Sequence, residues 1–206
     1  NYGAESLIAY ELGYRTQLTP KVSADIATFY HRYNRLRTFE PGSGFLSFTP
    51  TPHLEIPVVF DNKMQGHGYG VELSSTWSVT DSWKLTLGYS FLKIGLNLDR
   101  SSVDTLSKNS QGDSPQNQFH LRSYLDLPYH LNLDTALYYV DSVPNQSVPA
   151  YMRADIGLGW SPIKSLEVRI VGQNLFDQRH REFGSSFLTN PTKPERSVYG
   201  KILWRF

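Results

Sequence analysis

The chain of 206 residues contains no cysteine. This absence excludes a disulfide framework, a thiolate metal site and a cysteine nucleophile. The sequence also lacks a run of about 18 consecutive apolar residues, which a transmembrane helix requires. It begins with Asn1 and carries no signal peptide, so we expect a mature or truncated chain.

An excess of charge of one sign is also missing. Lys and Arg number 20, Asp and Glu number 19, and the formal net charge is +1. Nucleic-acid binding needs a concentrated basic face, whereas the longest basic cluster, residues 178–181, is followed at once by Glu182. We therefore expect no nucleic-acid partner. Aromatic residues are abundant, at 14%, as in the interfacial belts of membrane proteins.

Apolar and polar residues alternate with a period of two along most of the chain, which predicts β-strands. No apolar face of these segments carries Asp, Glu, Lys or Arg, while the opposite faces carry charge in nearly every segment. The pattern predicts nine strands, at residues 8–15, 22–31, 69–77, 83–91, 119–127, 131–139, 152–160, 166–176 and 197–206.

The connections between the predicted strands alternate between short and long. Tight turns are expected near residues 18–21, 80–82, 128–129 and 162–165, and longer connections over 34–65, 95–116, 142–150 and 178–195. Membrane barrels pair short periplasmic turns with long extracellular loops, and compact soluble domains rarely carry several long loops. A soluble barrel or sandwich, which would hide its apolar face, is the alternative that these lengths disfavour.

Aromatic residues gather on the apolar face beside the expected short turns, where an interfacial girdle belongs. They are Tyr14, Trp77, Trp83, Trp160 and Trp204. The sequence therefore predicts an all-β, antiparallel transmembrane barrel whose apolar face contacts lipid. The charges on the opposite face are expected to form cross-strand pairs and plug contacts; they are Glu11, Arg15, Arg122, Asp126, Arg153, Asp155, Glu167 and Arg169.

Five segments, in order along the chain, resemble strands of TonB-dependent receptor barrels. They are residues 5–15 (ESLIAYELGYR), 28–37 (TFYHRYNRLR), 69–73 (YGVEL), 171–177 (VGQNLFD) and 200–206 (GKILWRF). The resemblance implies a 22-stranded barrel of the bacterial cell outer membrane, with a plug and a TonB-contacting segment upstream. Residues 1–206 are then expected to be the C-terminal part of that barrel, about nine strands that form a curved open sheet when alone.

The resemblance also implies a function and partners. The parent protein would import a chelated nutrient, with a ferric siderophore as the first expectation and cobalamin, haem and oligosaccharide behind it. Its partners would be its own plug domain, TonB, the barrel-assembly machinery, and outer-membrane lipid with lipopolysaccharide. No cofactor is expected. A passive pore or adhesin barrel is the alternative function.

Two groups of candidate site residues emerge. Arginine beside aromatic residues can hold an anionic, ring-bearing chelate, and the outer loops are expected to carry Arg35, Arg37, Phe39, Arg100, Arg179 and Arg181. The same residues also suit ordinary solvated loops or lipopolysaccharide contacts, and the sequence leaves these open. An aromatic-ended last strand resembles the signal read by the assembly machinery, here Tyr199, Trp204 and Phe206; an interfacial anchor explains it equally.

Enzyme and metal chemistry find little support. Ser185, Ser186, His180 and Asp177 share one loop, as a rim-active hydrolase would need, but no Gly-x-Ser-x-Gly motif is present. The six histidines lack metal-ligand spacing, and we expect His53 and His180 to be solvated loop residues. We expect the protein not to be an enzyme.

Overall fold

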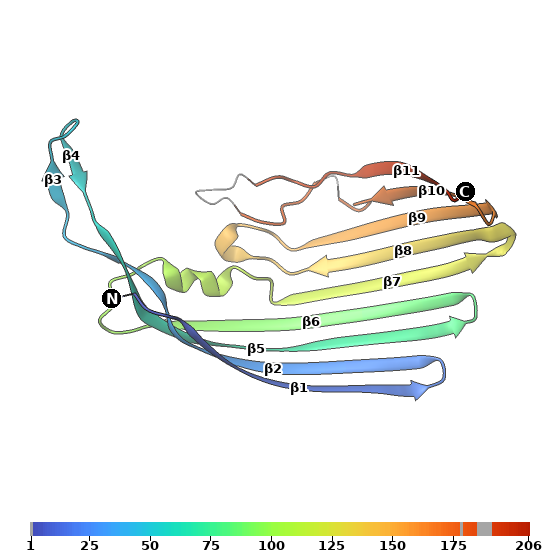
Figure 1. Cartoon of the computed structure of the whole chain (residues 1–206), viewed down its shortest axis with the longest axis horizontal. Helices are drawn as coiled ribbons and strands as arrows, with labels where there is room; N and C mark the ends of the chain where they lie inside the picture. Colours follow the sequence, from blue (N-terminus) through green and yellow to red (C-terminus); the bar gives the residue numbers. More distant parts are fainter. Residues whose placement is uncertain (1, 178, 185–190) are drawn as a thin grey trace.

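The computed structural model describes residues 2–177, 179–184 and 191–206. These residues form one twisted antiparallel sheet of nine strands and a small separate hairpin (Figure 1). The strands of the sheet are β1 (Ser6–Thr19), β2 (Val22–Pro41), β5 (Val58–Thr80), β6 (Trp83–Leu98), β7 (Asn117–Leu127), β8 (Leu131–Val140), β9 (Tyr151–Ile163), β10 (Leu166–Gln173) and β11 (Ser197–Trp204). The hairpin is β3 (Phe45–Ser47) with β4 (His53–Glu55), and the 3-10 turns are η1 (Ser107–Gly112), η2 (Pro128–His130) and η3 (Pro144–Gln146).

Strands adjacent in the sequence are adjacent in the sheet, in the order β1-β2-β5-β6-β7-β8-β9-β10-β11. Among the residues that the structure describes, β1 and β11 each pair on one side only, so the sheet is open rather than closed. They lie at opposite edges of Figure 1. The predicted nine-stranded, antiparallel architecture is confirmed.

The sheet is a single layer, and its apolar side is not covered by other elements. Outward-facing side chains such as Leu12, Ile202 and Trp204 are 76%, 73% and 70% exposed. Two of the few buried apolar residues, Met64 and Leu96, lie on the opposite side under the β6–β7 connection. A contiguous apolar face of this extent needs a nonaqueous neighbour, which a lipid bilayer provides.

Short turns lie at one end of the sheet and long connections at the other (Figure 1). The short turns are residues 20–21, 81–82, η2 at 128–130 and 164–165. Trp77, Trp83, Trp160 and Trp204 lie close to this end, on the apolar face, with Trp77 paired to Val22 and Trp160 to Leu131. The predicted girdle position is confirmed for the four tryptophans, whereas Tyr14 pairs with Ile26, further from the turn. This end is the periplasmic one by the general rule for bacterial barrels.

The connection expected over residues 34–65 is largely strand instead. β2 continues to Pro41 and β5 begins at Val58, with the β3–β4 hairpin between them. The register shifts twice, between Tyr33 and Leu36 and between Leu36 and Thr38. These irregularities interrupt the period-two pattern, which is why the sequence pattern ended near residue 31 while the hydrogen-bonded ladder did not.

Two strand ends also differ from expectation. β10 ends at Gln173, before Phe176, because Asn174 adopts a left-handed conformation with φ of 55°. β11 ends at Trp204, so Phe206 follows the strand rather than closing it. The Arg205 N–H still donates to the Ser165 carbonyl at 2.8 Å.

Two of the charges listed above, Arg15 and Arg169, pair with carboxylates across strands as predicted. Arg15 is directly opposite Asp25 and contacts its carboxylate, and Arg169 contacts Asp134 across the glycine at position 157. Arg153 binds Asp155 at 2.7 Å along the same strand.

Within the described residues, no helix has the length and apolarity needed to cross a membrane.

Candidate functional site

A cavity of about 620 Å³ lies at the long-loop end of the sheet. It is bounded by the ends of β1, β2, β5 and β6 and by the β6–β7 connection. Its lining is mainly apolar, with a few polar and charged groups, an arrangement common in ligand sites. The lining residues that matter below are Glu5, Arg37, Phe39, Val58, Met64, Leu96, Asp104 and Ser107.

Local irregularities of β2 and β5 create this cavity wall. Arg35 has φ of 58°, in the left-handed region that side chains rarely adopt. The Asn62 side chain donates to the Arg35 carbonyl at 2.5 Å and so supports the bulge from the neighbouring strand. Because bulges bend a strand and increase its twist, the two strands continue past the barrel wall as a projecting arm, seen at the upper left of Figure 1.

Arg37 lies over an aromatic pair at the cavity wall. Its guanidinium carbon is 5.2 Å from the centre of the Phe39 ring and 5.8 Å from that of Phe60. The two rings contact edge to face at 5.3 Å. Within the described part of the chain, the Arg37 side chain has no carboxylate partner. The Glu5 carboxylate, which also lines the cavity, accepts a hydrogen bond from the Arg37 backbone N–H at 2.8 Å. A guanidinium that lies on aromatic faces and makes no ion pair of its own is suited to an anionic ligand.

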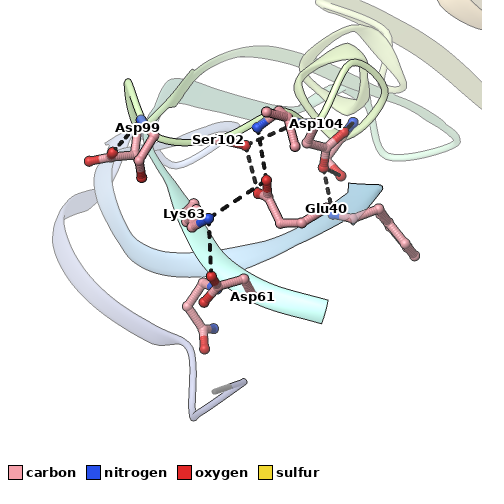
Figure 2. A network of polar contacts seen from close by, with 11 residues as sticks. Glu40, Asp61, Lys63, Asp99, Ser102 and Asp104 are labelled. Atoms are coloured by element: carbon pink, nitrogen blue, oxygen red, sulfur yellow. Dashed lines mark hydrogen bonds and ion pairs between the residues drawn. The ribbon is translucent and has the colours of Figure 1, made fainter. Parts of the chain in front are cut away.

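The β6–β7 connection is fastened to β2 by two carboxylates (Figure 2). Glu40 of β2 accepts hydrogen bonds from the Ser102 hydroxyl at 2.7 Å and the Val103 N–H at 2.8 Å. In return, Asp104 accepts from the Phe39 N–H at 2.7 Å. Glu40 and Asp104 are 8% and 5% exposed. Each element thus supplies one buried carboxylate to the backbone of the other.

Asp104 also organises its own loop. It accepts from the Leu106 N–H at 2.7 Å, the Ser107 N–H at 3.0 Å and the Ser107 hydroxyl. Burial raises the pKa of the Asp104 carboxyl, but these hydrogen bonds and that from Phe39 outweigh it and lower the pKa to about 2. The carboxyl is therefore ionised at neutral pH.

Lys63 supplies a positive charge beside Glu40. Its ammonium group is 3.8 Å from the Glu40 carboxylate and 3.3 Å from that of Asp61 (Figure 2). Glu40, Lys63 and Asp104 were not among the site residues predicted from the sequence. Asp104 could have been recognised from the sequence. An Asp in a connection between strands commonly accepts hydrogen bonds from backbone N–H groups a few residues ahead, as in an Asx turn.

The structure brings together only part of the predicted ligand set. Arg35, Arg37 and Phe39 lie in β2 rather than in a loop, because the ladder with β5 continues past the bulges. Arg37 and Phe39 line the cavity. Arg100, Arg179 and Arg181 do not: Arg100 lies in the turn after β6, Arg181 is exposed, and Arg179 is 3.9 Å from Glu195.

His180 is not the solvated histidine that the sequence suggested. It is 4% exposed, because its ring stacks on Tyr151 at 4.1 Å and its Nε2 lies 3.3 Å from a Glu182 carboxylate oxygen. His53 is exposed, and its ring contacts the Thr51 carbonyl. Ser185 and Ser186 lie outside the described residues. In the described ranges, no group of three metal-ligating side chains comes together.

The predicted assembly residues lie on or next to the edge strand β11. Trp204 and Tyr199 are 70% and 48% exposed, on opposite faces, and pair with Leu166 and Val171 of β10. Phe206 is fully exposed beyond the strand. The three side chains are therefore accessible at a free edge.

The sequence of residues 1–175 matches the family described as TonB dependent receptor-like, beta-barrel. The chain belongs to the TonB-dependent receptors. It is thus part of an outer-membrane receptor barrel of the Gram-negative type, and the predicted family, fold and location are confirmed. Receptors and transporters, rather than enzymes, make up the relatives described next.

Among curated proteins, this TonB-dependent receptor chain is 24% identical over 187 residues to the pesticin receptor of Yersinia enterocolitica and to that of Yersinia pestis. The match covers 88% of this chain and 26% of each relative, so the chain spans about a quarter of their length.

Solved structures show the same fold. The siderophore receptor PiuA of Acinetobacter baumannii superposes with a TM-score of 0.71 at 21% identity, covering 95% of this chain and 28% of that one. The iron transporter FrpB of Neisseria meningitidis superposes with a TM-score of 0.74 at 14% identity, covering 100% and 31%. The likeness extends over the whole sheet of the TonB-dependent receptor chain.

Proposed function

We propose that the chain is a barrel segment of an energised importer of ferric siderophores, and that its outer cavity helps to recognise the chelate. The observation that carries this proposal is the Arg37 guanidinium over Phe39 and Phe60, which makes no ion pair among the described residues, at the wall of a largely apolar cavity. Ferric siderophores present negative charge together with ring or carbonyl groups, which this arrangement matches.

The cavity is at the correct end of the barrel for this task. It lies opposite the Trp-rich short turns, on the side of the long connections, which face the outside in bacterial barrels. Two proteins of similar fold are named as a siderophore receptor and an iron transporter. We infer that the whole receptor also requires its plug, TonB and the barrel-assembly machinery, with Tyr199, Trp204 and Phe206 as the assembly signal, and that it is not an enzyme.

The test is uptake of iron by a strain that lacks the chromosomal gene and expresses the full-length receptor. Under iron starvation, the parent receptor restores growth on its siderophore in a TonB-dependent manner. Arg37→Gln is expected to weaken siderophore binding on the order of tenfold, as the loss of a charge-assisted contact does. Binding is measured by quenching of intrinsic fluorescence on purified receptor.

Arg181→Gln provides the matched control, because Arg181 is an exposed outer arginine away from the cavity. It should bind within about twofold of the parent, as surface substitutions usually do. Equal weakening by both variants contradicts the cavity assignment. TonB-independent leakage of small solutes would instead identify a passive pore. If the strain without the gene lost only a membrane-associated ester hydrolysis, the protein would be a hydrolase.

A further inference from the structure

The lipid-facing side of the first four sheet strands carries an aromatic row near its outer end. Tyr10 of β1 pairs with Tyr30 of β2, Tyr30 with Tyr69 of β5, and Tyr69 with Lys93 of β6. Side chains alternate between the two faces of a sheet, so these four residues share the face of the outward apolar residues. Tyr10, Tyr30 and Tyr69 are 61%, 46% and 39% exposed. The row of three tyrosines therefore ends at Lys93, a cation.

The next row toward the outside contains two more groups that can carry positive charge. Arg32 pairs with Ile8 and with His67, and His67 pairs with Gly95. The row after that is uncharged and consists of Ser6, Asn34, Gln65 and Asn97. Arg32, His67 and Lys93 thus form a basic cluster on three adjacent strands, and none of these three rows includes Asp or Glu.

His67 is held in a defined position within this cluster. Its ring is nearly parallel to that of Tyr30, at 6.4 Å and 12°, and to that of Tyr69, at 6.2 Å and 10°. The ring lies over Gly95, where an added Cβ would come 3.0 Å from it. A hollow of about 180 Å³ adjoins it, lined by Tyr30, Arg32, Asn34 and Asn97 among others. The cluster therefore has a shaped surface rather than scattered charges.

The position of the cluster relative to the membrane follows from strand geometry. Trp77, in the periplasmic girdle, and Tyr69 are on the same strand and eight residues apart, which is about 27 Å along a strand. A tilt of roughly 35–45° reduces this to about 20 Å of height, close to the roughly 25 Å apolar band of outer-membrane barrels. Arg32, His67 and Lys93 consequently lie at the outer edge of the band.

Cations at this place require anionic partners. Within the described residues, Arg32 and Lys93 make no ion pair with the protein. An arginine or lysine that faces lipid at the interface is stabilised when its head group meets anionic lipid. The nearest anions available on this face are the phosphates of outer-leaflet lipid.

We propose that Arg32, His67 and Lys93 bind the phosphate groups of lipopolysaccharide, with its acyl chains packed on the apolar face below. The Arg32 guanidinium and Lys93 ammonium supply the charge, and Asn34 and Asn97 add hydrogen-bond donors at the rim of the hollow. This site is on the outside of the barrel wall. It is separate from the cavity at the long-loop end and independent of the nutrient that the receptor transports.

The experiment uses the full-length receptor, purified in mild detergent and titrated with lipid A that carries two phosphates. Binding is followed by native mass spectrometry. Arg32→Gln combined with Lys93→Gln is expected to weaken binding on the order of tenfold or more. Lys84→Gln is the matched control, because Lys84 is on the same strand as Lys93 but faces the bore, and it should leave binding unchanged.

Measurements on the parent receptor keep the proposal testable if the double variant fails to fold. Lipid A without phosphate should bind on the order of tenfold more weakly, and inorganic phosphate alone should not compete at millimolar concentration. Equal binding of phosphorylated and dephosphorylated lipid A overturns the proposal, as does unchanged binding by a folded double variant. Competition by inorganic phosphate would point to a free-anion site and would also overturn it.

Discussion

At the scale of single residues, buried carboxylates determine how the outer end of this barrel wall is arranged. Asp104 and Glu40 are removed from water, which is costly for a carboxylate unless hydrogen-bond donors replace the lost solvent. Both are supplied with such donors, chiefly backbone N–H groups and serine hydroxyls. The position of the β6–β7 connection, and with it one wall of the cavity, depends on these few contacts.

Asp104→Asn is expected to loosen this connection. An amide in place of the carboxylate turns an acceptor into a donor facing the N–H groups of Phe39, Leu106 or Ser107, at a cost of about 1–3 kcal/mol. Hydrogen–deuterium exchange followed by mass spectrometry should show faster exchange at residues 104–107. The control is Asp113→Asn, in the same connection. Unchanged protection in Asp104→Asn would contradict the role given to the carboxylate.

Acidification should have the same effect on the parent protein. The pKa of the Asp104 carboxyl is about 2 in the folded state, below the ordinary value of 3.8. A carboxyl with a lowered pKa contributes stability above its ordinary value and loses it as the pH falls toward the folded value. Exchange at residues 104–107 should therefore rise between pH 3.8 and about 2, and this rise should be absent from Asp104→Asn.

At the scale of strands, close packing between neighbours limits which residues the sheet accepts. Gly70 of β5 lies so near the Phe91 carbonyl oxygen and the Phe29 ring that an added Cβ would overlap both. Gly68, on the same strand, has only side-chain atoms of Tyr33 and Ile94 nearby, at an ordinary 3.4–3.9 Å. The same residue type thus serves a packing need at one position of β5 and has none two residues away.

Gly70→Ala is expected to destabilise the full-length barrel by about 1–3 kcal/mol, because it overpacks a strand whose neighbours are held by ladder hydrogen bonds. Gly68→Ala should change stability by less than about 0.5 kcal/mol. The urea midpoint of the heat-modifiable, folded band on gels measures both. The expectation fails if the two variants unfold at the same midpoint as the parent.

The two faces of a strand should also differ in their tolerance of charge. Leu87→Lys places an ammonium on the lipid side near the middle of β6 and should cost about 2–4 kcal/mol. Ser90→Lys, three residues further along the same strand, places it on the bore side, opposite Glu72, and should be nearly neutral. A bilayer-refolding titration compares them, and equal costs would reverse the assignment of the faces.

At the scale of the whole molecule, the single-layer sheet has one apolar side and two free edges among the described residues. Unpaired backbone groups cannot be left in hydrocarbon, so an open sheet edge is not stable within a bilayer. In water, such an edge is a template for association with other strands. The nine strands therefore need further strands of a receptor barrel beside β1 and β11.

We expect residues 1–206 expressed alone to form no transport-competent monomer. The free edges of β1 and β11 should drive association, because edge pairing satisfies their backbone groups. Analytical ultracentrifugation in detergent should find heterogeneous oligomers, and the full-length receptor should sediment as one species. A monodisperse, heat-modifiable monomer from the isolated 206 residues would contradict this expectation.

The sequence alone determined the strand faces, the short turns and the position of the tryptophan girdle. Alternation with a period of two is a local property, readable from neighbours such as Trp83 and Leu85, and turn residues such as Pro20 and Asp81 mark where it stops. The order of five segments in the sequence also predicted the family. The sequence identified Arg37 and Phe39 as well, although it placed them in a loop.

Only the tertiary structure decided the continuation of β2 past Arg35, the contact between Asp104 and Phe39, and the row that unites Arg32 and His67. Bulges hide the alternation, and contacts between residues 65 positions apart depend on how a loop returns to the sheet. The partners of a strand position depend on register across several strands. Contacts between residues far apart in the sequence could therefore be established only from the tertiary structure, because no local sequence pattern encodes them.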